Sequence, residues 1–185
     1  MRSLKGFNEA ELEKYYKGNW ELLAKDPNLW YRSAESLKTT TDVLRKSQLW
    51  PENRERFGTK AAVADFLYGP VYMLLAGLAI ETLIKGIIVS QKPELVEQQE
   101  LSKELTRHNL IDLYQMAGLR VNPRRNNLLL RLQNYVENFG RYPVTKRKQD
   151  MKKLVQTRFA GQTDPDRIER LWSFLFRKYR SCISQ

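Results

Sequence analysis

The sequence contains very few of the residues that bind metals or carry out acid–base chemistry. Among 185 residues there is one histidine, His108, and one cysteine, Cys182. This pair is too small a ligand set for a zinc site, and a lone cysteine excludes an internal disulfide. A single thiol fits a reducing compartment, so we expect a cytoplasmic protein. We expect no metal and no other cofactor.

Other absences narrow the chemistry further. Neither GxxxxGK[ST] nor GxGxxG occurs, which excludes phosphate binding by a glycine-rich loop of those types. A Ser-His-Asp triad could draw only on His108, and no paired-carboxylate spacing stands out. Residues 1–14 contain no long apolar run, so we expect no secretory signal. No alternating apolar and polar run predicts a β-strand.

One long apolar segment, residues 66–89, has the length of a membrane span. A spanning helix needs about 20 uninterrupted apolar residues, whereas Glu81 and Lys85 interrupt this one and Gly69-Pro70 breaks its start. A charged residue near mid-bilayer costs about 2.5–3.5 kcal/mol. We therefore predict a buried central helix and no membrane contact.

Capping residues and apolar spacing predict helices nearly throughout the chain. The expected fold class is all-α, a single helical bundle over residues 1–185. The predicted helices run from Asn8 to about Lys25, from Pro27 towards Leu49, from about Thr59 to Gln91 with a kink or break at Gly69-Pro70, over Leu110–Ala117, from Pro123 to Gly140, over Lys146–Phe159, and from the cap Asp164 to about Cys182.

The net charge of +11 is confined to the end of the chain. Residues 1–119 hold 16 basic and 16 acidic side chains, whereas residues 120–185 hold 16 basic and 5 acidic ones. This asymmetry favours a polyanion or an acidic protein as partner of the C-terminal third. The densest basic run is either a partner surface or simply a solvated helix face; it comprises Lys146, Arg147, Lys148, Lys152 and Lys153.

Three polar residues stand out against their apolar surroundings. Glu81 and Lys85 have the i, i+4 spacing and order that favour an ion pair in a helix, and burial would force them to pair with each other or with neighbours. We interpret them as a structural or dimer-interface pair rather than a ligand site. Since histidine titrates near neutral pH, His108 is the candidate acid–base or phosphate-contacting group; alternatively it only packs at a helix start.

The residues from His108 to Leu119, with the helix that leads into Arg141-Tyr142-Pro143, resemble the HEPN domain, a helical domain linked to nucleotide binding. Residues 79–89 also resemble its central helix, where Glu81 and Lys85 match polar positions facing the bundle. The resemblance covers roughly residues 60–145. It implies an up-and-down helical core with additional N- and C-terminal helices, the latter being the basic residues 146–185, and a homodimer.

The resemblance also implies a role in RNA cleavage or in binding RNA, nucleotides or a nucleotidyltransferase, often in prokaryotic toxin–antitoxin or phage-defence systems. Ribonuclease members carry an Arg-x(4–6)-His motif. At those distances before His108 stand Leu101, Ser102 and Lys103, and Arg107 is adjacent instead. The sequence therefore favours a non-catalytic module.

We accordingly expect a HEPN-like module that binds nucleic acid or a nucleotide through its basic C-terminal surface, with RNA favoured over DNA. Two alternatives remain: a divergent metal-independent ribonuclease using His108, and an interaction subunit that binds an acidic protein. The candidate nucleic-acid- or anion-binding residues are Arg107, His108, Arg125, Arg141, Lys146, Arg147, Lys148, Lys152 and Lys153.

Overall fold

A computed structural model describes residues 8–46, 61–96, 100–139, 149 and 164–184, without the side chains of 61–68 and 139. These residues are helical almost throughout, which confirms the predicted all-α bundle. The only strand-like feature among them is an isolated bridge between Val96 and Leu101. The predicted helix Lys146–Phe159 lies outside the described residues, apart from Gln149.

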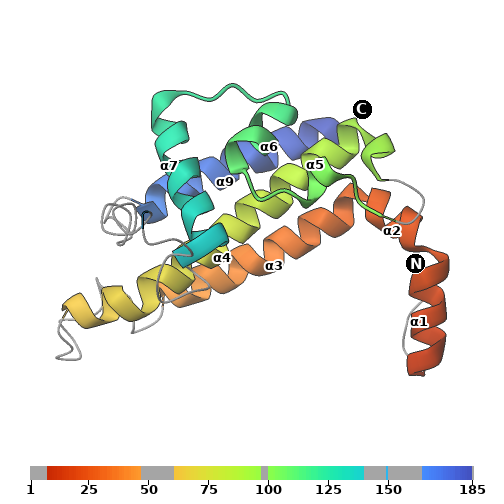
Figure 1. Cartoon of the computed structure of the whole chain (residues 1–185), viewed down its shortest axis with the longest axis horizontal. Helices are drawn as coiled ribbons and strands as arrows, with labels where there is room; N and C mark the ends of the chain where they lie inside the picture. The colour runs from red at the N-terminus through yellow and green to blue at the C-terminus, as the bar shows by residue number, and fades with distance from the viewer. Residues whose placement is uncertain (1–7, 47–60, 97–99, 140–148, 150–163, 185) are drawn as a thin grey trace.

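Helix α4 (Ala61–Gln91) forms the centre of the bundle. Figure 1 shows it running diagonally through the molecule with α3 (Pro27–Lys46) along its length. It also contacts α6 (Leu110–Met116), α7 (Pro123–Asn134) and α9 (Asp164–Ile183). Because neighbours cover it on several sides, α4 is apolar almost all round. Its fully buried side chains include Met73, Ala76, Ala79, Ile80, Leu83, Ile84, Ile87 and Ile88.

The predicted break at Gly69-Pro70 is absent, because α4 is one continuous helix through Pro70. Proline removes one backbone N–H and so one i→i−4 hydrogen bond, but the helix continues on both sides. By length and composition, Gly69–Gln91 could cross a membrane, and 72% of an 18-residue apolar stretch within it is buried inside the protein. A core helix of a bundle is buried to this extent by its neighbouring helices.

The N-terminal segment forms two helices instead of the single predicted one. The spacing of Asn8 and Glu11 predicts a capping box, and this is confirmed: the Asn8 side chain accepts the Glu11 N–H at 3.0 Å, and Glu11 accepts the Asn8 N–H at 2.9 Å. However, α1 (Glu9–Gly18) ends at Asn19, and α2 (Trp20–Lys25) follows. The Asn19 side chain donates to the Tyr15 carbonyl at 2.8 Å, which satisfies an end carbonyl of α1. No α1 residue is buried, and Figure 1 shows this helix pointing away from the bundle.

The chain between α6 and α7 turns as its residues predict. Gly118 follows α6 with φ +70°, and the Leu119 N–H donates to the Tyr114 carbonyl at 3.1 Å, as in a Schellman motif. Asn122 then caps α7, its side chain accepting the Arg125 N–H at 2.9 Å. These two motifs fix where the first turn of α7 lies.

The helix predicted to continue from α7 instead changes into a π-helical turn, η3 (Tyr135–Phe139). This segment packs closely on α4 at Gly77, where a Cβ atom would lie 2.7 Å from Val136 Cγ2 and 3.1 Å from the Leu132 carbonyl oxygen. Only glycine admits that approach without a shift of Val136.

Helix α9 buries the apolar stripe that its sequence predicts. Ile168, Leu171, Leu175 and Tyr179 are buried, and Trp172 is partly buried against the same core. Burying each of these large side chains contributes about 1.5–3 kcal/mol. The opposite faces of α9 remain free to carry charge.

Candidate functional site: an arginine pocket between α7 and α9

The described part of the chain includes only some of the predicted site residues. Arg107 is exposed between α5 (Lys103–Thr106) and α6. His108 contacts α4, and Arg125 lies at the start of α7. The other predicted candidates lie outside the described residues: Arg141, Lys146, Arg147, Lys148, Lys152 and Lys153.

The predicted Glu81–Lys85 pair is confirmed, and His108 joins it. Lys85 Nζ donates to Glu81 Oε1 at 2.6 Å, and His108 Nδ1 lies 3.0 and 3.2 Å from the two Glu81 oxygens. The Glu81 and Lys85 side chains are only 5% and 9% exposed, whereas that of His108 is 43% exposed. A buried carboxylate therefore orients an accessible imidazole. Its other nitrogen, Nε2, has no hydrogen-bond partner among the described residues.

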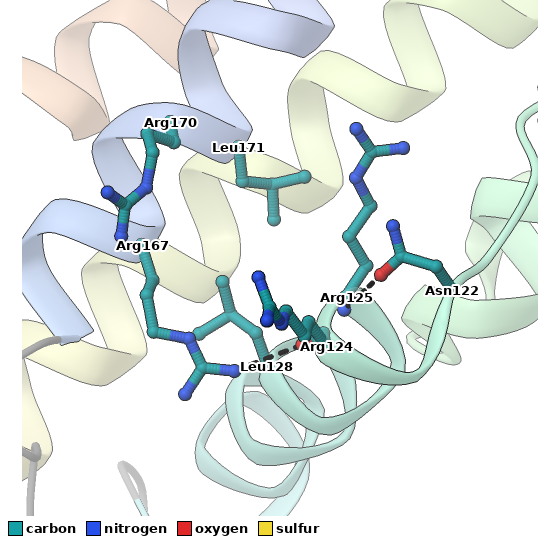
Figure 2. A pocket seen from close by; sticks show the side chains of 7 residues that line it. All are labelled: Asn122, Arg124, Arg125, Leu128, Arg167, Arg170 and Leu171. Carbon is teal, nitrogen blue, oxygen red and sulfur yellow. Dashed lines mark hydrogen bonds between the residues drawn. The ribbon is translucent and has the colours of Figure 1, made fainter.

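Four arginines surround a cavity between α7 and α9. The cavity has a volume of about 690 Å³. Its walls combine four arginines with an apolar floor, and none of its described lining residues is acidic. We call this the arginine pocket; Figure 2 shows its residues, which are Asn122, Arg124, Arg125, Leu128, Arg167, Arg170 and Leu171.

The arginines approach the arginine pocket from both helices. Figure 2 shows Arg167 reaching from α9 towards α7, where its Nη2 donates to the Arg124 carbonyl at 3.0 Å. Arg167 Nη1 is also 3.7 Å from Asp164 Oδ1. Within the described chain, Arg124, Arg125 and Arg170 have no carboxylate within ion-pair distance. Three of the four charges are therefore not neutralised by a described acidic side chain.

Arg125 is held in place by aromatic side chains. Its guanidinium carbon lies 4.1 Å from the centroid of the Phe174 ring, a cation–π contact. It also lies near the buried hydroxyl of Tyr114; burial raises the pKa of Tyr114, and the positive charge of Arg125 partly opposes that rise. Held this way, Arg125 loses less side-chain entropy when a ligand binds.

A buried ion pair joins the two walls of the arginine pocket. Asp164, at the start of α9, is 0% exposed, and its oxygens contact Arg131 of α7 at 2.8 Å (Oδ1–Nη1) and 2.6 Å (Oδ2–Nη2). Such bidentate pairs fix geometry as well as adding energy. The sequence predicts Asp164 as a cap preceding the helix, whereas α9 already begins at Asp164 and the carboxylate binds Arg131.

Of the candidate binding residues chosen from the sequence, only Arg125 lines this pocket; Arg124, Arg167 and Arg170 belong to the basic excess of residues 120–185 but were not chosen. Part of the signal was available: Arg167 and Arg170 are three residues apart and so share a face of α9, and the Asn122 cap places Arg124 in the first turn of α7. The packing of α7 on α9 could not be derived from those local patterns. That packing is what gathers the four arginines.

Comparison of the chain with protein-family models, with curated proteins and with solved structures finds no match. The fold and the site themselves define an all-α protein that concentrates positive charge in a cavity between two helices. Function is therefore inferred from the chemistry of that site.

Proposed function

We propose that this protein is a non-catalytic, HEPN-like module that binds RNA through its basic C-terminal third. The observation that carries the proposal is the arginine pocket, because all its described lining residues belong to residues 120–185, which hold the entire net charge of +11. The same third of the sequence also contains the predicted basic run Lys146, Arg147, Lys148, Lys152 and Lys153, which lies outside the described residues.

The pocket chemistry favours phosphate. Guanidinium groups present paired N–H donors that match phosphate oxygens, and the first turn of α7, where the positive end of its dipole lies, forms part of the pocket wall. Contacts of this kind give affinity with little choice of sequence. The resemblance to HEPN domains is the reason to favour RNA over DNA, and it extends the proposal to a homodimer acting in the cytoplasm in a prokaryotic defence or toxin–antitoxin system.

Binding of labelled single-stranded RNA across a salt series tests this proposal. We expect log Kd to rise steeply with log salt, by about 0.7 per phosphate contact. Replacing Arg124 and Arg170 together with glutamine should lower that slope by about 1.4 and weaken binding at least tenfold. Lys92→Gln is the matched control, since it removes an exposed charge at the end of α4 and should change neither quantity.

Two outcomes would contradict the proposal. Equal losses in the arginine variant and in Lys92→Gln would mean that the pocket is not the binding surface. Absence of RNA binding even at low salt would leave an acidic protein as the partner of the basic surface. Reversing the charges of Lys152 and Lys153 in the same assay tests the part of that surface outside the described residues.

A second candidate function, metal-independent RNA cleavage, rests on the contact between His108 and Glu81. A carboxylate that holds one ring nitrogen fixes the orientation of the imidazole, so that the other nitrogen can exchange a proton with substrate. The exposed side of His108 gives a substrate access. Arg107, Arg125 and Arg141 are the arginines that this hypothesis would recruit for the phosphate.

The cleavage hypothesis makes a separate prediction about RNA integrity. If the hypothesis holds, RNA incubated with the wild-type protein shows fragments on a gel. His108→Ala should reduce this cleavage by at least a hundredfold, and its melting temperature should stay within about 2 °C of the wild-type value. Full activity in His108→Ala would remove the catalytic assignment. Intact RNA with the wild type agrees with the non-catalytic module.

A further inference from the structure

The four arginines of the pocket surround one hollow instead of following a line. Arg124 and Arg125 come from α7, and Arg167 and Arg170 come from α9, with Leu128 and Leu171 between them (Figure 2). A surface that follows an RNA backbone needs cations spread along the path of the strand. The arginine pocket instead gathers its four arginines around one cavity.

The first turn of α7, whose residues line the arginine pocket, contains one backbone donor with no described acceptor. Pro123 has no N–H, and the Arg125 and Asn126 N–H groups bond to Asn122 at 2.9 and 2.8 Å. The Arg124 N–H has no partner among the described residues. It therefore stands available at the positive end of a 12-residue helix, beside three arginines that lack a described carboxylate partner.

A terminal phosphate fits this arrangement better than a phosphate within the chain. A phosphomonoester carries about −1.5 to −2 charges at pH 7 and three acceptor oxygens. A phosphodiester carries one negative charge, and the RNA strand continues from it on both sides. A cavity lined by four arginines, three of them without a described carboxylate partner, matches the group that has more charge and a single attachment.

We infer that the arginine pocket receives the terminal phosphate of an RNA strand, so that the protein distinguishes phosphorylated RNA ends from unphosphorylated ones. This inference rests on the proposed RNA-binding function and adds the part of the RNA that the pocket recognises. The remaining basic surface would then hold the phosphodiesters that follow the end.

The test compares three internally labelled RNAs of one sequence, carrying a 5′-phosphate, a 3′-phosphate or no terminal phosphate. We expect the wild-type protein to bind one phosphorylated RNA about ten- to a hundredfold more tightly than the unphosphorylated RNA. Arg170→Gln should remove most of this preference. Arg177→Gln, an exposed arginine two turns further along α9 and not part of the pocket lining, should keep it.

Each other outcome has a defined meaning. Equal, salt-sensitive binding of all three RNAs would overturn the inference while leaving the proposed function standing. No binding of any RNA would overturn both. Adenosine 5′-monophosphate serves as a competitor for the phosphorylated RNA. If it competes at the same concentration as unlabelled phosphorylated RNA, the ligand is a free nucleotide and the inference about RNA ends is overturned. Loss of the preference in Arg177→Gln as well as in Arg170→Gln would show that the pocket does not provide it.

Discussion

Replacing Asp164 with asparagine should lower the free energy of unfolding by about 3 kcal/mol or more. The Asp164 carboxylate is fully buried and bound by Arg131 through both oxygens. Removing one member of a buried pair leaves an uncompensated charge in the interior, which costs more than the pair contributed. Against a total stability of about 5–15 kcal/mol, this loss is large. Urea unfolding followed by circular dichroism measures it.

Asp166→Asn is the matched control, because it makes the same chemical change two residues further along α9. Asp166 is exposed, and its pair with Arg45 at 3.0 Å lies at the surface. Exposed pairs of this kind contribute about 0–1 kcal/mol. Equal losses for the two variants would mean that burial does not determine the role of Asp164. A larger loss at Asp164 would identify it as the contact that holds the walls of the arginine pocket together.

Glu81→Ala should destabilise the protein by about 3–5 kcal/mol, since it would leave Lys85 buried without its anion. The side chain of Lys85 is 9% exposed and donates to Glu81 at 2.6 Å, so little solvent contact would replace the lost carboxylate. The same substitution removes the contact that orients His108. Chemical denaturation of the variant provides the measurement.

A double variant separates the buried charge from other effects at this position. Glu81→Leu combined with Lys85→Met removes both charges and keeps apolar volume, so it should recover most of the stability that Glu81→Ala loses. If the double variant were as unstable as Glu81→Ala, loss of packing or of the His108 contact would be the cause. If Glu81→Ala lowered the free energy of unfolding by less than about 1 kcal/mol, the Glu81–Lys85 pair would contribute no more than a solvent-exposed ion pair, and the prediction would be wrong.

Local sequence signals predicted which segments are helical more accurately than where one helix ends and the next begins. Asn8, Gly118 and Asn122 act as their residue types predict, because caps depend on side chains within a few residues. The continuous helix through Pro70 and the break at Asn19 were not predicted. At Pro70 the packing of α4 in the core outweighs one lost hydrogen bond, and at Asn19 a side chain competes with the backbone for the end of α1.

The candidate site could be predicted only in part, for a physical reason. The Glu81–Lys85 pair follows from helix periodicity, since both partners lie on one element. The contact with His108 and the pair between Arg131 and Asp164 join residues 27 and 33 positions apart. Such contacts depend on how helices pack, which a local pattern does not encode. Charge segregation pointed to the part of the chain that contains the arginine pocket, whose described lining residues all fall within residues 120–185.

The central position of α4 has a consequence for how the chain is made. Helix α9, which covers part of α4, begins at Asp164, long after α4 ends at Gln91. At a synthesis rate of about 5–20 residues per second, the ribosome takes roughly 4–15 seconds to add the intervening chain. During that interval the nascent protein carries an apolar helix with part of its surface uncovered. Chaperone binding to translating ribosomes should therefore peak between synthesis of α4 and synthesis of α9.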